Sequence, residues 1–532
     1  MSSSQLNYPV KLQLQTQEKK QTLSLKKGPQ REKIDLDQFA VRLVRSGNSL
    51  QPHITADEDD TLHSLILTIP LGETWAPLFR KEDRSAHSSL LLLSENNSVM
   101  QINLSPREKG TVKFTLDEKG GALEILWDAP FPLKAKEELD LPEIQMTLRD
   151  KRVEPVRFGL RNPAGTNLNR GRLFSFTGRP DLEEIRRDVN VLSAGKNRFD
   201  FFLLDYGTAS EWGDWDQPLP AFTEGINSLP GLVRPLGALA GVRLSPLTCS
   251  KKSEFYKNGK ELLLGKGKTF KILSQPGNPI LQPLDITKKA VQEHIDKSLN
   301  YYVSRGIKFI HLDHLDLLFS EAEWETAMEP QKRLKLLTDL MEPFKSRGVK
   351  FSTTPLPICE ELDRFDVIFS GLDDPQTGFS DLMNLAVSLK NSPPLSLGKL
   401  ILSDKGKNRE KKRRKIHLHS QSLLNGPFLL GDKTDDLDEG LLESWKIWAT
   451  DRKDPLLPLE VSEYGLGQGV LLLMNRQKMT AILNLGRKTR VISLKEGELA
   501  GSRGYSPSET TSLKSRELIL QMNRESSHYF RV

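Results

Sequence analysis

The chain has 532 residues, of which 37% are hydrophobic and 27% charged, so it is long enough for two or three packed domains and too apolar to be disordered. Its net charge of +6 is small for this length and does not indicate a nucleic-acid partner. Two cysteines, Cys249 and Cys359, do not make a disulfide framework. The N-terminus lacks the apolar core of a signal peptide, and no apolar run approaches the ~18 residues of a membrane span. We therefore expect a cytoplasmic protein without a membrane partner, and a homo-oligomer is compatible with the sequence.

Short alternating strands dominate residues 1–163. Six runs, HSLILTIPL, SLLLLSE, VMQINL, TVKFTL, GALEILW and EIQMTLRD, follow one another with turn residues between them. Regularly spaced short strands of this kind predict a β-sandwich. The first 30 or so residues are rich in Lys and Gln, which leaves open either a frayed, disordered segment or an outer strand.

Residues 164–452 alternate apolar strands with helices. Two amphipathic segments, 289–306 and 330–348, end on Arg-Gly, which is typical of a helix C-cap, and lead directly into the next strand. Continuous apolar strands between helices predict a parallel sheet, and eight such units predict a (β/α)₈ barrel. The eight runs are 172–176, 198–205, 240–247, 307–313, 348–357, 365–371, 398–404 and 425–432.

Residues 453–532 return to a β pattern that no helix interrupts, with the runs GVLLLMN, MTAILNLG, TRVISL and ELILQMN. They predict a small C-terminal β-sandwich. The fold class expected from the whole chain is therefore a multidomain α/β protein, a TIM barrel flanked by two β-sandwiches.

Aspartates gather where the predicted barrel strands end. The last residue of a barrel strand faces the active site, so these carboxylates are expected to converge on one concave surface. Each of them alone would serve equally well as the N-cap of the following helix. Together they favour polyol recognition and acid chemistry. Four strands end on one aspartate and another is followed by two: Asp205, Asp313, Asp404, Asp432, Asp373 and Asp374.

The turn after the second barrel strand adds aromatic residues to this acidic rim. Trp212 and Trp215 flank Gly213 and Asp214. Indole faces stack on the C–H face of a pyranose ring, and carboxylates accept hydrogen bonds from sugar hydroxyls. The turn therefore favours a carbohydrate partner.

At this point the barrel segment resembles the retaining α-galactosidases, the melibiase-like glycoside hydrolases, as a divergent member. The family's second strand reads roughly Asp-Asp-Gly-Trp and then Gly-Asp-Trp, where this chain has LDYGT and then Gly213-Asp214-Trp215. The family's third strand reads Gly-x-Trp-x-x-Pro, matched by GVRLSP at 241–246, and Leu-Asp-hydrophobic-Thr before the fourth strand is matched by LDIT at 284–287.

The resemblance implies roles for individual residues. Asp313, in HLDH, stands where the family has its nucleophile, and Asp373, in FSGLD, where it has its acid/base, with Asp374 as the alternative. It implies an N-terminal β-sandwich, a barrel and a C-terminal β-domain, and neither a cofactor nor a metal. The substrate-binding set that it implies is Asp205, Tyr206, Trp212, Asp214, Trp215, Arg243, His311 and Asp374.

Several family residues are replaced. Tyr206 stands for the second Asp, Thr208 and Arg243 for two Trp, His311 for Lys and Phe369 for Arg, and Phe176 stands where the first strand usually has Trp. Several of these positions line the galactose subsite in the family. We therefore expect weak cleavage of simple α-galactosides and a preference for an acidic or modified sugar that Arg243 pairs with. The alternative is a catalytically silent barrel that binds carbohydrate or has a structural role.

Two other signals do not lead to a site. In HLDHLD, strand geometry puts His311 and Asp313 on one face and His314 on the other, so the run does not predict a metal centre. The basic run 405–415 has no interleaved aromatic residues and is expected to be a solvated loop or the start of a helix.

Overall fold

The computed structural model describes most of residues 168–372, parts of 393–442, the strands on either side of that region, and some side chains between residues 51 and 144. Within 168–442 the undescribed residues are 177–179, 266–269, 272–279, 321, 323, 329, 357–359, 371, 373–392, 402, 404–420, 422–425 and 438–441. Outside the described residues therefore lie Cys359, Asp373, Asp374, Asp404 and the basic run 405–415.

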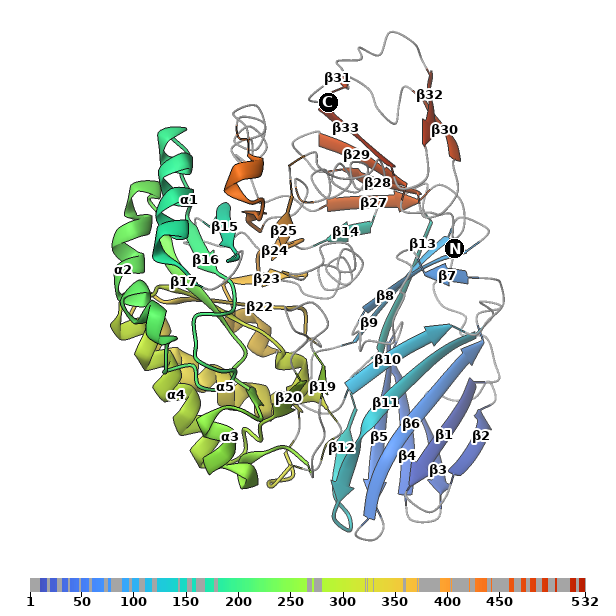
Figure 1. The fold of residues 1–532 in the computed structure, drawn as a ribbon. Coiled ribbons are helices and arrows are strands. Elements are labelled where there is room, and N and C mark those ends of the chain that lie inside the picture. Colours follow the sequence, from blue (N-terminus) through green and yellow to red (C-terminus); the bar gives the residue numbers. More distant parts are fainter. Residues whose placement is uncertain are drawn as a thin grey trace.

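The centre of the molecule is a sheet in which every pairing is parallel (Figure 1). Its strand order is β24-β23-β22-β21-β17-β16-β15-β26-β25. The strands are β15 (Arg170–Phe174), β16 (Phe201–Leu204), β17 (Leu239–Leu244), β21 (Phe309–Leu312), β22 (Lys350–Thr353), β23 (Val367–Phe369), β24 (Leu395–Ser396), β25 (Lys399–Leu400) and β26 (Phe428–Leu430).

The strand order returns to its starting point through one short segment. β24 and β25 are two-residue pieces of the stretch 395–400, and they occupy the two ends of the sheet order. β24 pairs with β23, whereas β25 pairs with β26. The same segment thus serves as the seventh of eight strands, as in a TIM barrel. It begins three residues before the strand predicted from the sequence.

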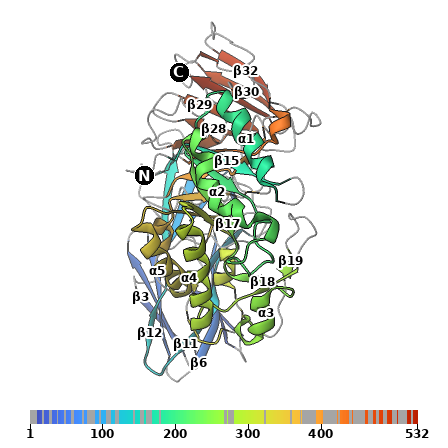
Figure 2. The same ribbon diagram turned by 60° about the vertical axis from the view of Figure 1, so that its left-hand side comes forward.

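Helices cover the outer face of this sheet, as Figures 1 and 2 show. The longest described ones are α1 (Leu182–Ala194), α2 (Thr223–Val233), α4 (Lys289–Ser304) and α5 (Pro330–Lys345), and α3 (Glu254–Asn258) is a short one. Asp181 caps α1 by accepting a hydrogen bond from the Glu183 N–H. The Arg-Gly pairs predicted to end two helices do so, because Gly306 and Gly348 adopt positive φ angles of 86° and 80° just after α4 and α5.

Antiparallel sheets lie before and after the barrel segment in the chain. One N-terminal sheet has the order β10-β11-β6-β1-β2, and the other has β3-β4-β5-β13-β9-β8-β7 with β12 beside β5. The N-terminal strands are β1 (Val10–Thr16), β2 (Lys20–Leu25), β3 (Arg31–Leu36), β4 (Phe39–Ser46), β5 (Ser49–Ala56), β6 (Asp60–Pro70), β7 (Trp75–Pro77), β8 (Ser89–Ser94), β9 (Ser98–Leu104), β10 (Thr111–Leu116), β11 (Ala122–Leu133), β12 (Glu138–Asp140) and β13 (Ile144–Asp150). Residues 1–30 thus contain two strands.

The C-terminal sheet has the order β14-β27-β28-β29-β33-β31, and β30 pairs separately with β32. The strands of these two sheets are β14 (Val156–Phe158), β27 (Leu459–Glu463), β28 (Val470–Met474), β29 (Met479–Asn484), β30 (Arg490–Lys495), β31 (Arg503–Gly504), β32 (Glu517–Met522) and β33 (Ser526–Arg531). β14 comes from the segment assigned to the N-terminal domain but pairs with β27. That the flanking sheets form two sandwiches stays a prediction.

The interior of the parallel sheet is apolar at its centre. Phe201 and Leu203 belong to one packed cluster, and Phe202 and Leu204 belong to the cluster beneath the helices, so the side chains of β16 alternate between the two faces. The rings of Phe201 and Phe309 stack at 4.1 Å. The glycine between their strands, Gly241, permits this, because a Cβ there would lie 2.9 Å from the Phe309 carbonyl oxygen.

A buried ion pair joins this sheet to its first helix. The Arg172 guanidinium donates to the Asp188 carboxylate through Nε at 2.9 Å, and also to the carbonyl oxygens of Leu430 and Asp432. The side chains of Arg172 and Asp188 are 2% and 0% exposed. Strand β15, helix α1 and strand β26 are thereby held through one side chain.

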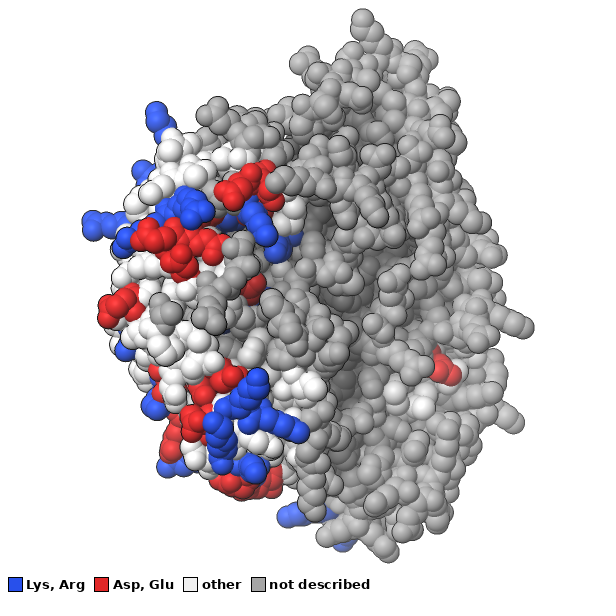
Figure 3. All heavy atoms as spheres, viewed as in Figure 1, with Lys and Arg blue, Asp and Glu red and all other residues white. Residues whose placement is uncertain are grey.

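The described outer surface carries charges of both signs, which are intermixed over the helices (Figure 3). Several form pairs along a helix, such as Arg186 with Glu183 and Lys335 with Asp339. No described helix is both long enough and apolar enough to cross a bilayer.

We predict that Asp188→Asn lowers the free energy of unfolding by about 3–5 kcal/mol, because it leaves the buried Arg172 charge without its carboxylate partner. The matched control on the same helix is Glu183→Gln, whose ion pair is half exposed and is worth about 0.5 kcal/mol or less. Urea denaturation of both variants measures the two losses. Equal losses would show that the buried pair does not stabilise the barrel.

Candidate functional site

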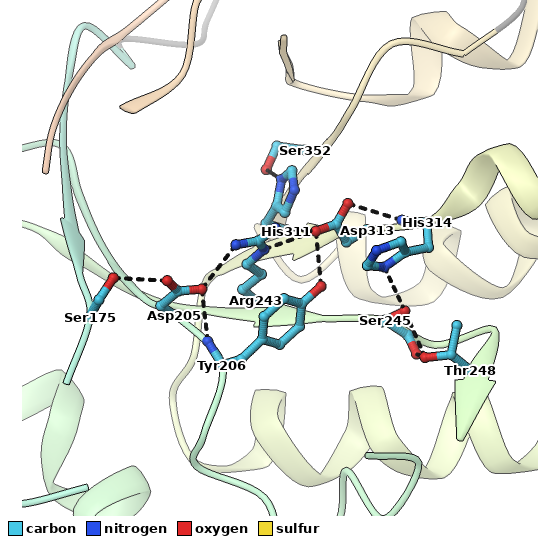
Figure 4. A network of polar contacts seen from close by, with 10 residues as sticks. All are labelled: Ser175, Asp205, Tyr206, Arg243, Ser245, Thr248, His311, Asp313, His314 and Ser352. Atoms are coloured by element: carbon cyan, nitrogen blue, oxygen red, sulfur yellow. Dashed lines mark hydrogen bonds and ion pairs between the residues drawn. The ribbon is translucent and has the colours of Figure 1, made fainter. Parts of the chain in front are cut away.

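Three charged side chains meet at the carboxyl ends of adjacent strands (Figure 4). Asp205 follows β16, Arg243 lies near the end of β17 and Asp313 follows β21. Each lies two residues beyond an interior position (Leu203, Gly241 and His311), so the period of two turns all three to the same side. Their side chains are 14%, 3% and 7% exposed, respectively. The aspartates at 205 and 313 therefore converge, as the sequence predicted.

Arg243 binds both carboxylates. Its Nη1 donates to Asp205 Oδ1 at 3.0 Å, and its Nε donates to Asp313 Oδ2 at 2.9 Å. Nη2 also donates to Asp313 Oδ2, at 2.5 Å. The buried guanidinium thus binds two carboxylates of the protein, and the expected pairing of Arg243 with an acidic sugar stays a prediction.

The two oxygens of Asp313 have different surroundings. Oδ2 accepts from Arg243 and from the Tyr206 hydroxyl, which is 2.9 Å away. Oδ1 accepts from the His314 backbone N–H at 3.0 Å. Burial favours the neutral acid and raises the pKa of Asp313, but the charge of Arg243, supported by His314 and His311, outweighs it and holds that pKa far below its usual range. Asp313 is therefore a carboxylate at neutral pH.

Asp205 is held by three donors. The Ser175 hydroxyl donates to Oδ2 at 2.8 Å, and the Tyr206 backbone N–H donates to Oδ1 at 2.9 Å, beside Arg243. Ser175 was not predicted from the sequence. The two-residue period of a strand could have predicted it, because Ser175 lies two residues after the interior Leu173 on the neighbouring strand.

Tyr206 connects the charged centre to an aromatic cluster. Arg243 lies over its ring at 4.4 Å, and the ring of Trp212 lies 4.3 Å away on a tilted plane. Burial, and then the neighbouring Asp313 charge, raise the pKa of Tyr206 well above 10, so its hydroxyl remains a donor. Tyr206 and Trp212 are both partly exposed and thus available to a ligand.

The other two residues of the Trp212–Trp215 turn have architectural surroundings. Both oxygens of Asp214 accept backbone N–H groups at the start of α3, from Glu254 at 2.9 Å and Phe255 at 3.0 Å. Trp215 is 4% exposed and lies in the core. The Trp215 ring nevertheless lies next to those of Tyr206 and Trp212, with centroids 6.2 and 5.6 Å away, whereas the carboxylate of Asp214 is bound at the start of α3.

The Trp212–Trp215 turn packs against the segment that follows β17. This segment forms a small sheet of the strands β18 (Thr248–Ser250), β20 (Ile280–Pro283) and β19 (Phe270–Lys271). Gly213 adopts a φ of 102°, and a Cβ there would lie 2.5 Å from the Cβ of Cys249. Burial raises the pKa of the Cys249 thiol to about 12, so it is a packing residue rather than a nucleophile.

His311 and His314 are held by different hydroxyl groups. His311 is fully buried, with Nδ1 3.0 Å from the Ser352 Oγ in the barrel interior. The Nδ1 of His314 lies 3.0 Å from the Ser245 Oγ, which accepts from Thr248. Among the described residues, no group of three or more His, Cys, Asp or Glu side chains is placed to hold a metal ion.

Two other sequence motifs have structural roles. Asp432 is 2% exposed and accepts the Ser403 backbone N–H at 2.6 Å, so it fixes a loop. Asp285, in LDIT, accepts the N–H of Thr287 just before α4 and the N–H of Glu325 from the segment before α5. Asp373 and Asp374 lie outside the described residues, so their roles stay predictions.

We predict that Arg243→Met lowers stability by about 3–5 kcal/mol at neutral pH, because it leaves buried carboxylates without their cation. The folded-state pKa of Asp313 is lowered, so its contribution is present above the unfolded-state value of about 4 and is lost as the pH falls below it. In the variant, burial raises the pKa of this carboxyl instead. The stability gap between wild type and variant should therefore narrow on acidification.

Urea denaturation at about pH 7 and about pH 3 measures this gap, with 3.9 as the reference value of a free aspartate. The control is Arg186→Met, which removes an exposed guanidinium from helix α1 and should change stability little at either pH. A gap for Arg243→Met that is the same at both values would contradict the assigned charge of Asp313.

Neither a protein-family model nor a curated protein matches the sequence. Solved structures do match its fold. The α-galactosidase from Lactobacillus brevis aligns with a TM-score of 0.60 at 10% identity over 98% of this chain and 86% of that one. The GH36 α-galactosidase AgaA from Geobacillus stearothermophilus, in complex with raffinose, gives 0.58 at 13% identity over 93% and 81%.

The α-galactosidase TtGalA from Thermus thermophilus, in complex with p-nitrophenyl α-D-galactopyranoside, aligns with a TM-score of 0.53 at 12% identity over 83% of this chain and 97% of that one. The resemblance predicted from the barrel motifs is thus confirmed in three dimensions over most of the chain. The protein has the fold of the GH36 α-galactosidases, at low sequence identity.

Proposed function

We propose that the protein is a glycoside hydrolase that acts on an α-linked glycoside by retaining double displacement. The observation that carries this proposal is Asp313, a carboxylate at the end of the fourth barrel strand whose Oδ1 accepts only one hydrogen bond from the described residues. Three donors hold its other oxygen in place. A fixed, ionised carboxylate, one of whose oxygens accepts a single hydrogen bond from the described residues, suits a nucleophile.

In this reaction Oδ1 of Asp313 forms a bond to the anomeric carbon while the bond from that carbon to the leaving oxygen breaks. The electron pair of that bond goes to the leaving oxygen, which takes a proton from the acid/base. The resemblance assigns this second role to Asp373, with Asp374 as the alternative. The same residue then deprotonates the water that hydrolyses the glycosyl-enzyme. The domains proposed for this activity are residues 1–163, 164–452 and 453–532.

The sugar subsite is proposed to differ from that of an α-galactosidase. Neighbouring structures contain raffinose, or p-nitrophenyl α-D-galactopyranoside, so α-galactosides are the first substrates to compare. Arg243 takes the position of a family Trp and adds buried charge where the family has an aromatic face. Tyr206 and Trp212 remain as aromatic surface near Asp313. We expect weak turnover of simple α-galactosides and better turnover of another α-glycoside.

A barrel that binds carbohydrate without cleaving it is the second candidate. One observation favours it: Arg243 and Tyr206 place three donors on one oxygen of Asp313. Hydrogen bonds to a carboxylate lower its basicity and, with that, its reactivity as a nucleophile. A silent barrel of this kind would show a thermal shift with a free sugar in the absence of turnover.

We predict that Asp313→Ala abolishes turnover of every glycoside that the wild type cleaves, because no substrate can form the glycosyl-enzyme without it. A panel of p-nitrophenyl α- and β-glycosides first identifies the substrate. Asp373→Ala should still be glycosylated by an activated aryl glycoside, and added azide, which needs no deprotonation, should restore its turnover with retained configuration. Full activity of Asp313→Ala would exclude the mechanism.

The matched control is Asp432→Asn, an aspartate at the end of another barrel strand that holds a backbone N–H. It should change stability more than the rate of turnover. If azide rescues Asp374→Ala and not Asp373→Ala, the two roles are exchanged and the mechanism stands.

A further inference from the structure

We infer that the loop after β21 and the first turn of α5 form a binding site for a small oxyanion group (a carboxylate, sulfate or phosphate), which Arg333 and Ser320 hold beside Trp324. The loop follows the strand that carries Asp313, and loops in this position form the rim of a barrel mouth. Binding of an anion needs no catalysis, so the inference does not rest on the proposed function.

The first observation is a buried cation with an incomplete environment. Arg333 is 4% exposed, and its Nε is buried without a hydrogen-bond partner among the described residues. Its Cζ lies 4.1 Å from the centre of the Trp324 ring. The face of an indole attracts a guanidinium, but it carries no net charge to balance the cation. A buried charge is unfavourable unless it is paired and its N–H groups are used.

The described carboxylate that acts on this cation is engaged elsewhere. Burial lowers the pKa of Arg333 to about 10, against the effect of the Asp285 charge, so Arg333 is still a cation at neutral pH. The two oxygens of Asp285 accept the backbone N–H groups of Thr287 and Glu325. The Glu325 carboxylate in turn pairs with Lys288 at 2.8 Å. A further anion next to Arg333 would therefore stabilise it.

The second observation is a hydroxyl group against the same indole. Ser320 follows the short helix η4 (Leu315–Phe319), which packs on α5. Its Oγ is buried and has no hydrogen-bond partner among the described residues. Its carbonyl oxygen accepts from Trp324 Nε1 at 3.3 Å. Ser320 thus contacts the N–H edge of the indole and Arg333 its face, so two groups with an unused donor lie beside one side chain.

The chemistry of these two groups points to an oxyanion. A water molecule would satisfy their hydrogen bonds, but it would leave the charge of Arg333 unbalanced. An oxyanion supplies both the charge and several acceptor lone pairs, and a guanidinium binds such a group through parallel N–H bonds. Trp324 is partly exposed, whereas Arg333 is buried. We therefore expect a small group to enter along the indole, either as an inorganic anion or as the acidic substituent of a carbohydrate.

Urea denaturation in increasing sulfate tests the site directly. A ligand that binds only the folded state lowers the unfolding constant about tenfold at ten times its Kd. The wild type should show this saturable effect. Arg333→Met keeps an apolar side chain of similar length on Trp324 but removes the charge, so it should show none. The general effect of sulfate on protein stability is common to both proteins and cancels in the comparison.

The same variant distinguishes a ligand site from a packing role. Without an oxyanion, Arg333→Met should leave the unfolding constant unchanged or lower it, because it removes an unbalanced buried charge. At ten times the Kd of sulfate, the variant should instead unfold more readily than the wild type, by about tenfold. If Arg333 only packs on the indole, the variant loses the same stability with and without sulfate, which would overturn the inference.

A matched control is Arg347→Met. Arg347 is exposed just beyond the end of the same helix, and its guanidinium lies 5.9 Å from the Phe344 ring. This variant should respond to sulfate as the wild type does. If it loses the response as completely as Arg333→Met, sulfate acts on the general charge of the helix and the inference fails.

Ser320→Ala keeps the test decisive if Arg333→Met does not fold. It removes one donor and no charge, so sulfate should bind roughly three- to tenfold more weakly. Its stability without sulfate should change little, because the buried hydroxyl has no partner among the described residues to lose. An unchanged affinity for sulfate would exclude Ser320 from the site and overturn the inference.

Parallel titrations identify the source of the anion. Sulfate and phosphate represent inorganic anions, D-glucuronate represents an acidic carbohydrate, and D-glucose is its uncharged control. A response to glucuronate that glucose does not give, and that Arg333→Met abolishes, supports the carbohydrate source. A response to sulfate or phosphate alone supports the inorganic source.

Two results overturn the inference whichever source applies. One is the absence of a saturable response to all three anions. The other is that every response survives Arg333→Met, because the anions then bind elsewhere, for example at Arg243. A protein that binds an oxyanion through Arg333 but cleaves no glycoside in the panel would exclude the proposed reaction and leave this inference standing.

Discussion

One guanidinium that binds two carboxylates links the ends of three neighbouring strands at the barrel mouth. A cation as buried as Arg243 is unfavourable unless its charge is balanced and its N–H groups are used. The two carboxylates that do this follow the strands on either side of it, β16 and β21, at the same height above the apolar interior. The ends of three neighbouring strands are thereby fixed relative to one another.

The residues that follow β16 have two kinds of surroundings. Tyr206 and Trp212 pack next to the charged centre, where Arg243 lies over the tyrosine ring. Gly213 and Asp214 instead join the turn to the segment around Cys249 and α3, and Trp215 lies in the core beside both Tyr206 and Trp212. A motif that forms one cluster in the sequence is thus partly exposed aromatic surface and partly framework.

The sequence predicted the arrangement of strands well because the physical signal is local. Apolar runs such as 201–204 and 309–312 need burial on both faces, and helices that end on Arg-Gly turn the chain back into the sheet. The period of two then gave the convergence of Asp205 and Asp313. The start of the seventh strand was misplaced, because its two halves pair with different neighbours.

The partners of the site residues could not be predicted in the same way. That Asp214 caps α3 depends on residues 254 and 255, and that Ser175 binds Asp205 depends on a contact between two strands. The sequence motif at 213–215 is the same whether the carboxylate meets a helix or a sugar. That Arg243 binds Asp205 and Asp313 could not be predicted either, because its position between two acids follows only from the neighbouring strands on both sides.

The seventh strand also makes the sheet uneven in strength around its circumference. β24 and β25 each contribute a ladder of two residue pairs, so the stretch 395–400 has such a short ladder on both sides; β22 and β23 also share two pairs, whereas β16 and β17 share four. Local opening of a fold starts where the fewest hydrogen bonds must break together. Residues 395–400 therefore form the seam of the barrel, and their amide protons are expected to exchange with solvent before those of the strands that carry Asp205, Arg243 and Asp313.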